Sequence, residues 1–125
     1  MSTWRQKAMA CLPESKKDIE HPDMSIYEVF SYMLTALVEA HKNNNIEQLR
    51  LIYDYAEWCH RQKEKDLWNA AGVAFYEHLG DRIETRESIA QWVKYDIYKE
   101  IRGLLKSRMS ERSLQEIDRS YRAAN

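Results

Sequence analysis

Residues 67–79, LWNAAGVAFYEHL, form a nearly continuous apolar segment that Gly80 follows directly. Only Asn69, Glu77 and His78 interrupt it. A helix that is apolar on every side belongs in a protein interior or a membrane, and about 13 residues are too few to cross a bilayer. The segment therefore predicts a buried helix at the centre of a helical domain. Its N-cap is expected at the preceding Asp66, and Gly80 is expected to end it.

Two amphipathic helices are predicted immediately before this segment. A capping-box motif, S-x-x-E at residues 25–28, indicates a helix over residues 26–42. The three asparagines at 43–45 favour a tight turn, and the following helix, residues 46–62, is apolar around roughly two-thirds of its circumference. Short connections place neighbouring helices antiparallel. The sequence thus predicts an all-α fold, a compact bundle of four to five main helices with a helical-hairpin core around residues 46–80.

The two ends of the chain specify helices with different strength. Thr85 is placed to cap a fourth main helix over residues 86–107, and Ser110 is placed to begin a last helix. Before the capping box the helix signals are weak. We therefore expect one helical domain over residues 1–125, with a weakly structured N-terminal segment at residues 1–24.

Length and composition favour one domain in a reducing compartment. The chain has 125 residues, of which 19 are basic and 20 are acidic. Cys11 and Cys59 are far apart and have no metal-binding or redox spacing, so both are expected to be reduced thiols, with Cys59 in the core. No apolar run has the form of a signal peptide or a transmembrane helix. The expected localisation is cytoplasmic, without contact to a membrane.

Charge is distributed unevenly along the chain. Residues 14–57 contain nine acidic and four basic side chains, a net charge of −5, whereas residues 99–125 contain seven basic and four acidic ones, a net charge of +3. The near-neutral total argues against a nucleic-acid partner. One interpretation is that these charges form only solvated helix faces. The alternative is that the acidic half forms a surface that steers a basic partner.

Motifs for catalysis or metal binding are weak. Glu57 and His60 have the Glu-x-x-His spacing of di-iron helices, but such sites need two of these motifs and two further glutamates. An ion pair between Glu57 and Arg61 is the simpler interpretation. The sequence contains no nucleophile-elbow motif and no glycine-rich phosphate loop. We therefore expect neither an enzyme nor a bound cofactor or metal.

The ends of two predicted helices carry titratable side chains. His41 and His78 each lie in a last turn, where a histidine can bind free carbonyl groups and interact with the helix dipole. Glu77 lies on the apolar segment, and an unpaired carboxylate there would be costly to bury. Either an arginine pairs with Glu77, or the carboxylate opens to a groove.

Aromatic side chains are numerous, with eight tyrosines and four tryptophans. Core packing accounts for many of them, because each ring buries a large apolar area. The remainder can anchor a protein interface. Trp92, Tyr95 and Tyr98 flank the apolar stripe of the predicted fourth helix, so we expect these three to be exposed anchors.

The central hairpin resembles a known group of proteins. An aromatic, acid-containing helix at residues 49–58, a turn, an Asn-Ala-rich helix and the ending FYEHLG at residues 75–80 are similar to small all-helical bacterial proteins of unknown function. The resemblance covers residues 26–80. Some members of that group are suspected immunity proteins of polymorphic toxin systems. The resemblance therefore implies a toxin inhibitor, and it transfers no catalytic residue.

These observations lead to a non-catalytic protein-binding domain as the first hypothesis, with an immunity-type inhibitor of a cognate toxin as its specific form. The expected partner-binding residues are Glu28, Glu39, Asp54, Glu57, Glu77, Trp92, Tyr95 and Tyr98. Two alternatives stay open. One is a small-molecule or metal-binding domain that uses Glu77, His78 and His41 at a common helix end. The other is a structural homodimer that buries the tyrosine-rich side of the fourth helix, in place of a monomeric inhibitor.

Overall fold

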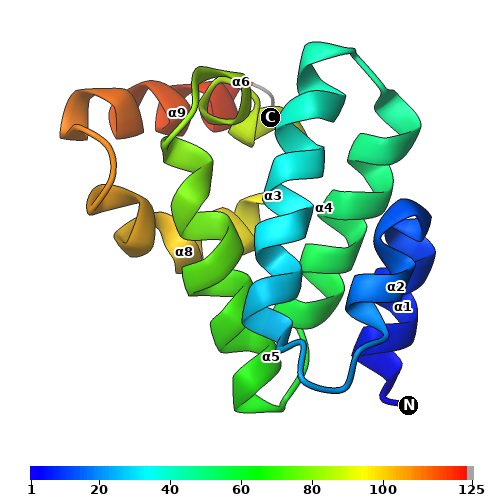
Figure 1. The fold of residues 1–125 in the computed structure, drawn as a ribbon. Helices are drawn as coiled ribbons and strands as arrows, with labels where there is room; N and C mark the ends of the chain where they lie inside the picture. The colour runs from blue at the N-terminus through cyan, green and yellow to red at the C-terminus, as the bar shows by residue number, and fades with distance from the viewer. Residues whose placement is uncertain (124–125) are drawn as a thin grey trace.

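Three long helical segments lie side by side at the centre of the molecule (Figure 1). The computed structural model describes residues 1–123, and these form helices and connections without a strand. The central segments are α3 (Ile26–Lys42), α4 (Ile46–His60) and the succession α5 (Lys65–Ala70), η2 (Ala71–Phe75) and η3 (Tyr76–Gly80). The predicted all-α fold class is confirmed. Residues 124–125 of the predicted domain lie outside the described residues.

The predicted start of α3 and the predicted turn before α4 are both present. The Ser25 hydroxyl accepts a hydrogen bond from the Glu28 N–H, and the Glu28 carboxylate accepts one from the Ser25 N–H, each at 3.1 Å. Asn44 has a positive φ of 52°, which asparagine tolerates. The Asn45 side chain then accepts from the Gln48 N–H at 3.2 Å and caps α4. Local side-chain chemistry therefore begins both helices.

The apolar segment at residues 67–79 is helical but is not one regular α-helix. It begins at Lys65 with Glu64 in the N-cap position, so the expected cap at Asp66 is wrong. It widens into a π-turn at η2 and tightens into a 3₁₀ turn at η3. Nor is it buried on every side, because Trp68 in its first turn is 42% exposed.

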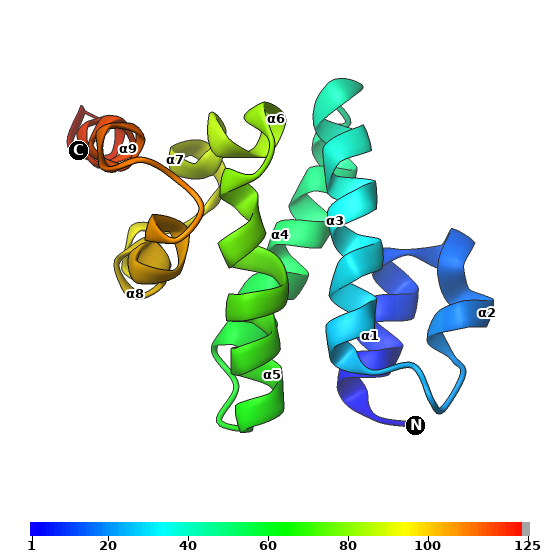
Figure 2. The same cartoon turned by 60° about the vertical axis from the view of Figure 1, so that its left-hand side comes forward.

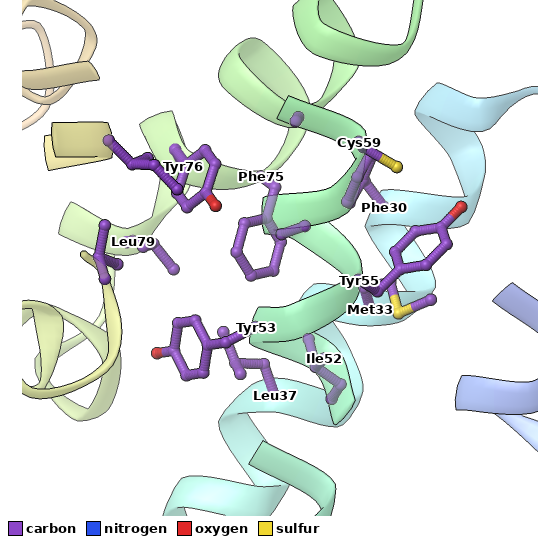
Figure 3. Packing of buried hydrophobic residues seen from close by; sticks show 14 of the residues in the cluster. Phe30, Met33, Leu37, Ile52, Tyr53, Tyr55, Cys59, Phe75, Tyr76 and Leu79 are labelled. Carbon is purple, nitrogen blue, oxygen red and sulfur yellow. The ribbon is translucent and has the colours of Figure 1, made fainter. Parts of the chain in front are cut away.

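The core lies where α3, α4 and η2 meet (Figure 3). The Phe30 ring packs 5.6 Å, centroid to centroid, from the rings of both Tyr55 and Phe75. The Tyr53 ring meets Phe75 edge-on at 6.1 Å. Tyr76 follows directly and is also buried. The centre of the molecule is therefore an aromatic cluster shared by three segments that are distant in sequence.

The predicted fourth helix over residues 86–107 is wrong. The chain instead forms α6 (Ile83–Arg86), α7 (Ile89–Trp92) and α8 (Tyr95–Lys106). Val93 is extended between α7 and α8, with ψ of 125°. Its carbonyl accepts a hydrogen bond from the Tyr121 hydroxyl at 2.5 Å, and the Ile89 carbonyl accepts from the same hydroxyl at 3.2 Å. A contact from the last helix, α9 (Glu111–Ala123), thus stabilises a break that the local pattern does not show.

Thr85 and Gly80 also have other roles than those predicted. The Thr85 hydroxyl is buried and donates to the Leu79 carbonyl at 2.6 Å, so it joins α6 to η3 rather than capping a helix. Gly80 does not have the positive φ of a helix-ending glycine. A Cβ at this position would lie 2.5 Å from Cγ of Met109. Space, rather than backbone conformation, requires glycine at position 80.

The N-terminal segment is helical and packed, against the expectation of weak structure at residues 1–24. It forms α1 (Thr3–Cys11), η1 (Pro13–Ser15) and α2 (Lys16–Ile19), which lie on the side of α3 and α4 opposite to α8 and α9 (Figure 2). The Arg5 guanidinium donates to the carbonyls of Ile19, His21 and Met24 at 2.6, 2.8 and 3.0 Å. One side chain on α1 thereby holds the returning chain. Among the helices of residues 1–123, none has both the length and the apolarity to cross a bilayer.

Candidate protein-binding groove

A groove of about 700 Å³ runs between the outer side of α3 and the N-terminal segment. We call it the acidic groove. Its apolar lining comes from Leu12, Ala36 and Ala40, and its carboxylates come from Glu14 on η1 and Glu39 on α3. The end nearest the α3–α4 turn is lined by the polar side chains of Asn43, Asn45 and Gln48.

Hydrogen bonds between distant residues fix the two walls of the acidic groove. The Gln48 side chain donates to the Cys11 carbonyl at 3.3 Å and joins the start of α4 to the end of α1. The Tyr32 hydroxyl donates to the Asp18 carboxylate at 3.3 Å and joins α3 to α2. The groove is therefore part of the folded structure rather than a gap beside a loose tail.

The two carboxylates of the acidic groove are free to meet a partner. Among residues 1–123, no basic side chain forms an ion pair with Glu14 or Glu39, and both residues are exposed. Oε1 of Glu39 accepts a hydrogen bond from the Asn43 side chain at 3.2 Å. That bond orients the carboxylate and leaves its second oxygen open.

Carboxylates in the two halves of the chain differ in their pairing. Within the described chain, the acids of residues 14–66 lack a basic side chain within 4.0 Å except at Asp23 and Glu57. From residue 77 to residue 118, every acid except Glu87 has such a partner. The sequence shows the excess of acid in the front half. The structure adds that most of those carboxylates are not neutralised inside the molecule.

The predicted acidic site residues lie on several faces rather than on one surface. Glu28 and Glu39 are exposed near opposite ends of α3, and Asp54 is exposed on α4. Glu57 is held by Arg61 and Lys94, each at 2.9 Å. Burial raises the pKa of the Glu57 carboxyl, but the hydrogen bonds from these two cations outweigh burial and leave the pKa below its usual value. Of the predicted acids, only Glu39 lines the acidic groove.

Glu77 pairs with an arginine, which is the first of the two alternatives that its place on the apolar segment predicts. Nη2 of Arg108 lies 3.4 Å from Oε2 of Glu77, and Nη1 lies 3.8 Å from the Asp81 carboxylate. Asp81 in turn binds Nδ1 of His78 at 2.9 Å. The end of the central segment is therefore tied to the turn after α8 by an ion-pair network.

The predicted aromatic anchors differ in exposure. Tyr95 is 52% exposed, as expected. Tyr98 is wrong as an exposed anchor, because it is 1% exposed and its hydroxyl donates to Asp118 at 2.6 Å. Trp92 is half-buried, and its ring stacks on Tyr53 at 5.3 Å. The break of the predicted helix at Val93 separates Trp92, which packs on Tyr53, from Tyr95 and Tyr98, whose rings both pack against Tyr121.

The histidines do not gather at a common helix end. Nε2 of His41 lies 2.8 Å from the Tyr53 hydroxyl, whereas His78 binds Asp81. Nε2 of His60 lies 3.1 Å from the Glu100 carboxylate, so Glu57 and His60 have separate partners. Among residues 1–123, no cluster of three or more histidine, cysteine or carboxylate side chains is placed to hold a metal ion.

Both cysteines are buried as free thiols. Burial raises the pKa of Cys11 and of Cys59 to about 12, so each sulfur stays protonated at neutral pH. A protonated, enclosed thiol is a poor nucleophile. These two residues therefore act as small core side chains.

Sequence reasoning missed Glu14 and Tyr32 as groove residues. Glu14 belongs to the acidic half that the charge count identifies, but the segment containing it was expected to be weakly structured. The packing of Pro13 after α1 is what places Glu14 opposite α3. The local signal for this turn is Pro13 itself, because proline is common at the first position of a helical turn.

Comparison with known proteins identifies a family and no closer relative. The family described as Domain of unknown function (DUF7674) matches residues 5–120. Neither the curated proteins nor the solved structures contain a significant match.

Proposed function

This chain belongs to the DUF7674 family, a domain of unknown function, and we propose that it is a non-catalytic domain that acts by binding another protein. The acidic groove is the observation that carries the proposal. Its walls are fixed by long-range hydrogen bonds, and its two carboxylates have no cationic partner among the described residues. A preformed surface with unneutralised charge favours rapid and specific association with an oppositely charged protein.

The specific form of the proposal is a bacterial immunity-type inhibitor that works in the cytoplasm and covers the active site or partner surface of a cognate toxin. Such an inhibitor needs a self-sufficient fold and a charged face rather than reactive groups. Buried, protonated thiols and an extended aromatic core agree with this requirement. The resemblance of residues 26–80 to small helical proteins with suspected immunity members supports the same form.

A partner test addresses the proposal directly. The gene immediately upstream is the first candidate, because immunity proteins are usually encoded beside their toxins. The purified product of that gene should bind this protein as a defined complex in calorimetry, and coexpression should relieve any growth arrest it causes. Size-exclusion chromatography with light scattering would distinguish a monomeric from a dimeric inhibitor. If neither the upstream nor the downstream product binds, even at low salt, the immunity-type proposal is wrong.

A further inference from the structure

We infer that the acidic groove receives a basic segment of the partner protein, one that presents arginine or lysine side chains from an extended stretch or a loop. This inference rests on the proposed function and specifies its contact. The relevant observations are the charge of the groove compared with its neighbours, the chemistry of its floor and the orientation of Glu39.

The acidic groove differs in charge from two other grooves on the described part of the chain. It is lined by Glu14 and Glu39 and by no lysine or arginine. A second groove, of about 420 Å³, lies between α3 and α6 and has two acidic and two basic side chains: Glu39, Asp81, Lys42 and Arg82. A third, of about 690 Å³ near the start of α5, has three acidic and two basic ones: Asp23, Glu64, Asp66, Arg5 and Lys65. A cationic partner is therefore complementary to the first groove above all.

The floor of the acidic groove suits the stems of basic side chains. Leu12, Ala36 and Ala40 line the groove together with the two carboxylates and provide its apolar surface. Arginine and lysine lay their methylene stems along such surfaces while the charged group reaches a polar rim. A negatively charged or purely apolar segment would leave Glu14 and Glu39 without compensation.

Glu39 is prepared for such a contact by its own hydrogen bond. Asn43 holds one carboxylate oxygen at 3.2 Å, and both residues lie on or directly after the last turn of α3. The remaining oxygen can accept a guanidinium or ammonium N–H without a further change of side-chain conformation. Less conformational entropy is then lost when the ion pair forms.

The test uses a short acetylated and amidated peptide of alternating arginine and leucine, titrated into the ¹⁵N-labelled full chain and followed by heteronuclear NMR. The same peptide with glutamate in place of arginine, and spermine, are the comparison probes. Amide shifts are expected along η1 and the outer side of α3 with the basic peptide. The acidic peptide should cause none. Spermine should bind at least several-fold more weakly, because it has ammonium groups and methylene stems but lacks the leucine side chains of the peptide.

Two matched double variants separate groove binding from general charge attraction. Glu14→Gln with Glu39→Gln should weaken peptide binding about fivefold, as expected for two exposed ion pairs. Glu64→Gln with Glu87→Gln removes the same charge at exposed acids outside the acidic groove. This control should change peptide binding less than twofold, because salt screens charges that are distant from the bound peptide. All four positions are exposed, and thermal unfolding of each variant verifies that the fold is kept.

Three results would overturn the inference. They are equal loss in the two double variants, shifts spread over all the unpaired acids, and spermine binding as tightly as the peptide. The proposed function is judged separately. If the upstream gene product forms a complex whose shifts lie outside the acidic groove, the protein-binding function stands and the groove assignment falls.

Discussion

His41 shows how one buried contact makes stability depend on pH. Burial lowers the pKa of its imidazole from the usual value near 6.5, with partial opposition from Glu84, and Nε2 lies 2.8 Å from the Tyr53 hydroxyl. As the pH falls, His41 binds a proton at a higher pH in the unfolded chain than in the folded one. The contribution of His41 to the free energy of unfolding is therefore fully present above about pH 6.5, and it is lost as the pH falls toward the lower pKa of the folded state.

We therefore expect the melting temperature to fall between pH 7.5 and pH 5, and the fall to be smaller in His41→Gln. Differential scanning calorimetry at several pH values measures this slope. His21→Gln is the matched control, because the His21 side chain is 63% exposed and should keep the wild-type slope. A slope that survives unchanged in His41→Gln would assign the pH dependence to another group.

Glycines at positions 80 and 103 should respond in opposite directions to alanine. A Cβ at Gly80 would lie 2.5 Å from Cγ and 2.9 Å from Sδ of Met109, whereas a Cβ at Gly103 would have no atom within 4 Å. Gly80→Ala should lower the free energy of unfolding by about 1–3 kcal/mol. Gly103→Ala, on the exposed side of α8, should raise it by about 0.5–1 kcal/mol. Urea denaturation gives both values.

Met109→Ala provides the internal test of the cause. In that background the added methyl group at position 80 has room, so the cost of Gly80→Ala should fall to less than half. An unchanged cost would mean that a contact other than the Met109 side chain excludes alanine at position 80.

At the scale of elements, several side-chain hydrogen bonds hold the N-terminal segment together and against the central helices, and Arg5 makes three of them. Arg5 on α1 donates to three carbonyls of residues 19–24, and the Tyr55 hydroxyl donates to the Trp4 carbonyl at 3.0 Å. These contacts hold α1 and α2 beside α3, where η1 forms a wall of the acidic groove. The stability of the wall is therefore set by hydrogen bonds that cross from one helix to the next.

Arg5→Lys should loosen that wall. The planar guanidinium of Arg5 donates to three carbonyls at once, and a lysine ammonium lacks this forked geometry. We expect a loss of about 1–2 kcal/mol in stability and faster hydrogen exchange confined to residues 16–25. Arg50→Lys on α4 is the control, since Arg50 is exposed. Exchange that rises equally throughout the chain would contradict a local role for Arg5.

At the scale of the whole molecule, unpaired acids collect in the front half, and most acids of the back half lie within ion-pair distance of an arginine or a histidine. Long-range attraction of a basic partner should therefore come mainly from the front half. The rate of association with the partner should fall several-fold from low to physiological ionic strength, as screening shortens the reach of these charges.

Charge variants locate that attraction. Glu14→Gln with Glu39→Gln should slow association at low salt, measured by stopped-flow fluorescence. Glu111→Gln with Glu116→Gln removes the same formal charge at residues that already have arginine partners and should have a smaller effect. If both pairs slow association equally, net charge rather than the placement of unpaired carboxylates governs the rate.

The sequence by itself determined the all-α class, the bounds of α3, the turn before α4 and the acidic character of the front half. These features rest on side-chain periodicity, on caps that act within three residues and on simple charge counting. They also placed Glu39 correctly on an exposed helix face.

Only the tertiary structure decided the break at Val93, the burial of Tyr98, the packing of residues 3–19 and the pairing of Glu77. Each depends on a partner distant in sequence: Tyr121 for Val93, Asp118 for Tyr98, the carbonyls of residues 19–24 for Arg5, and Arg108 for Glu77. The acidic groove belongs to this second group, because Glu14 and Glu39 line one surface only after the N-terminal segment has packed against α3. Local patterns report on neighbours a few residues apart, whereas a groove is defined by which distant segments the core brings together.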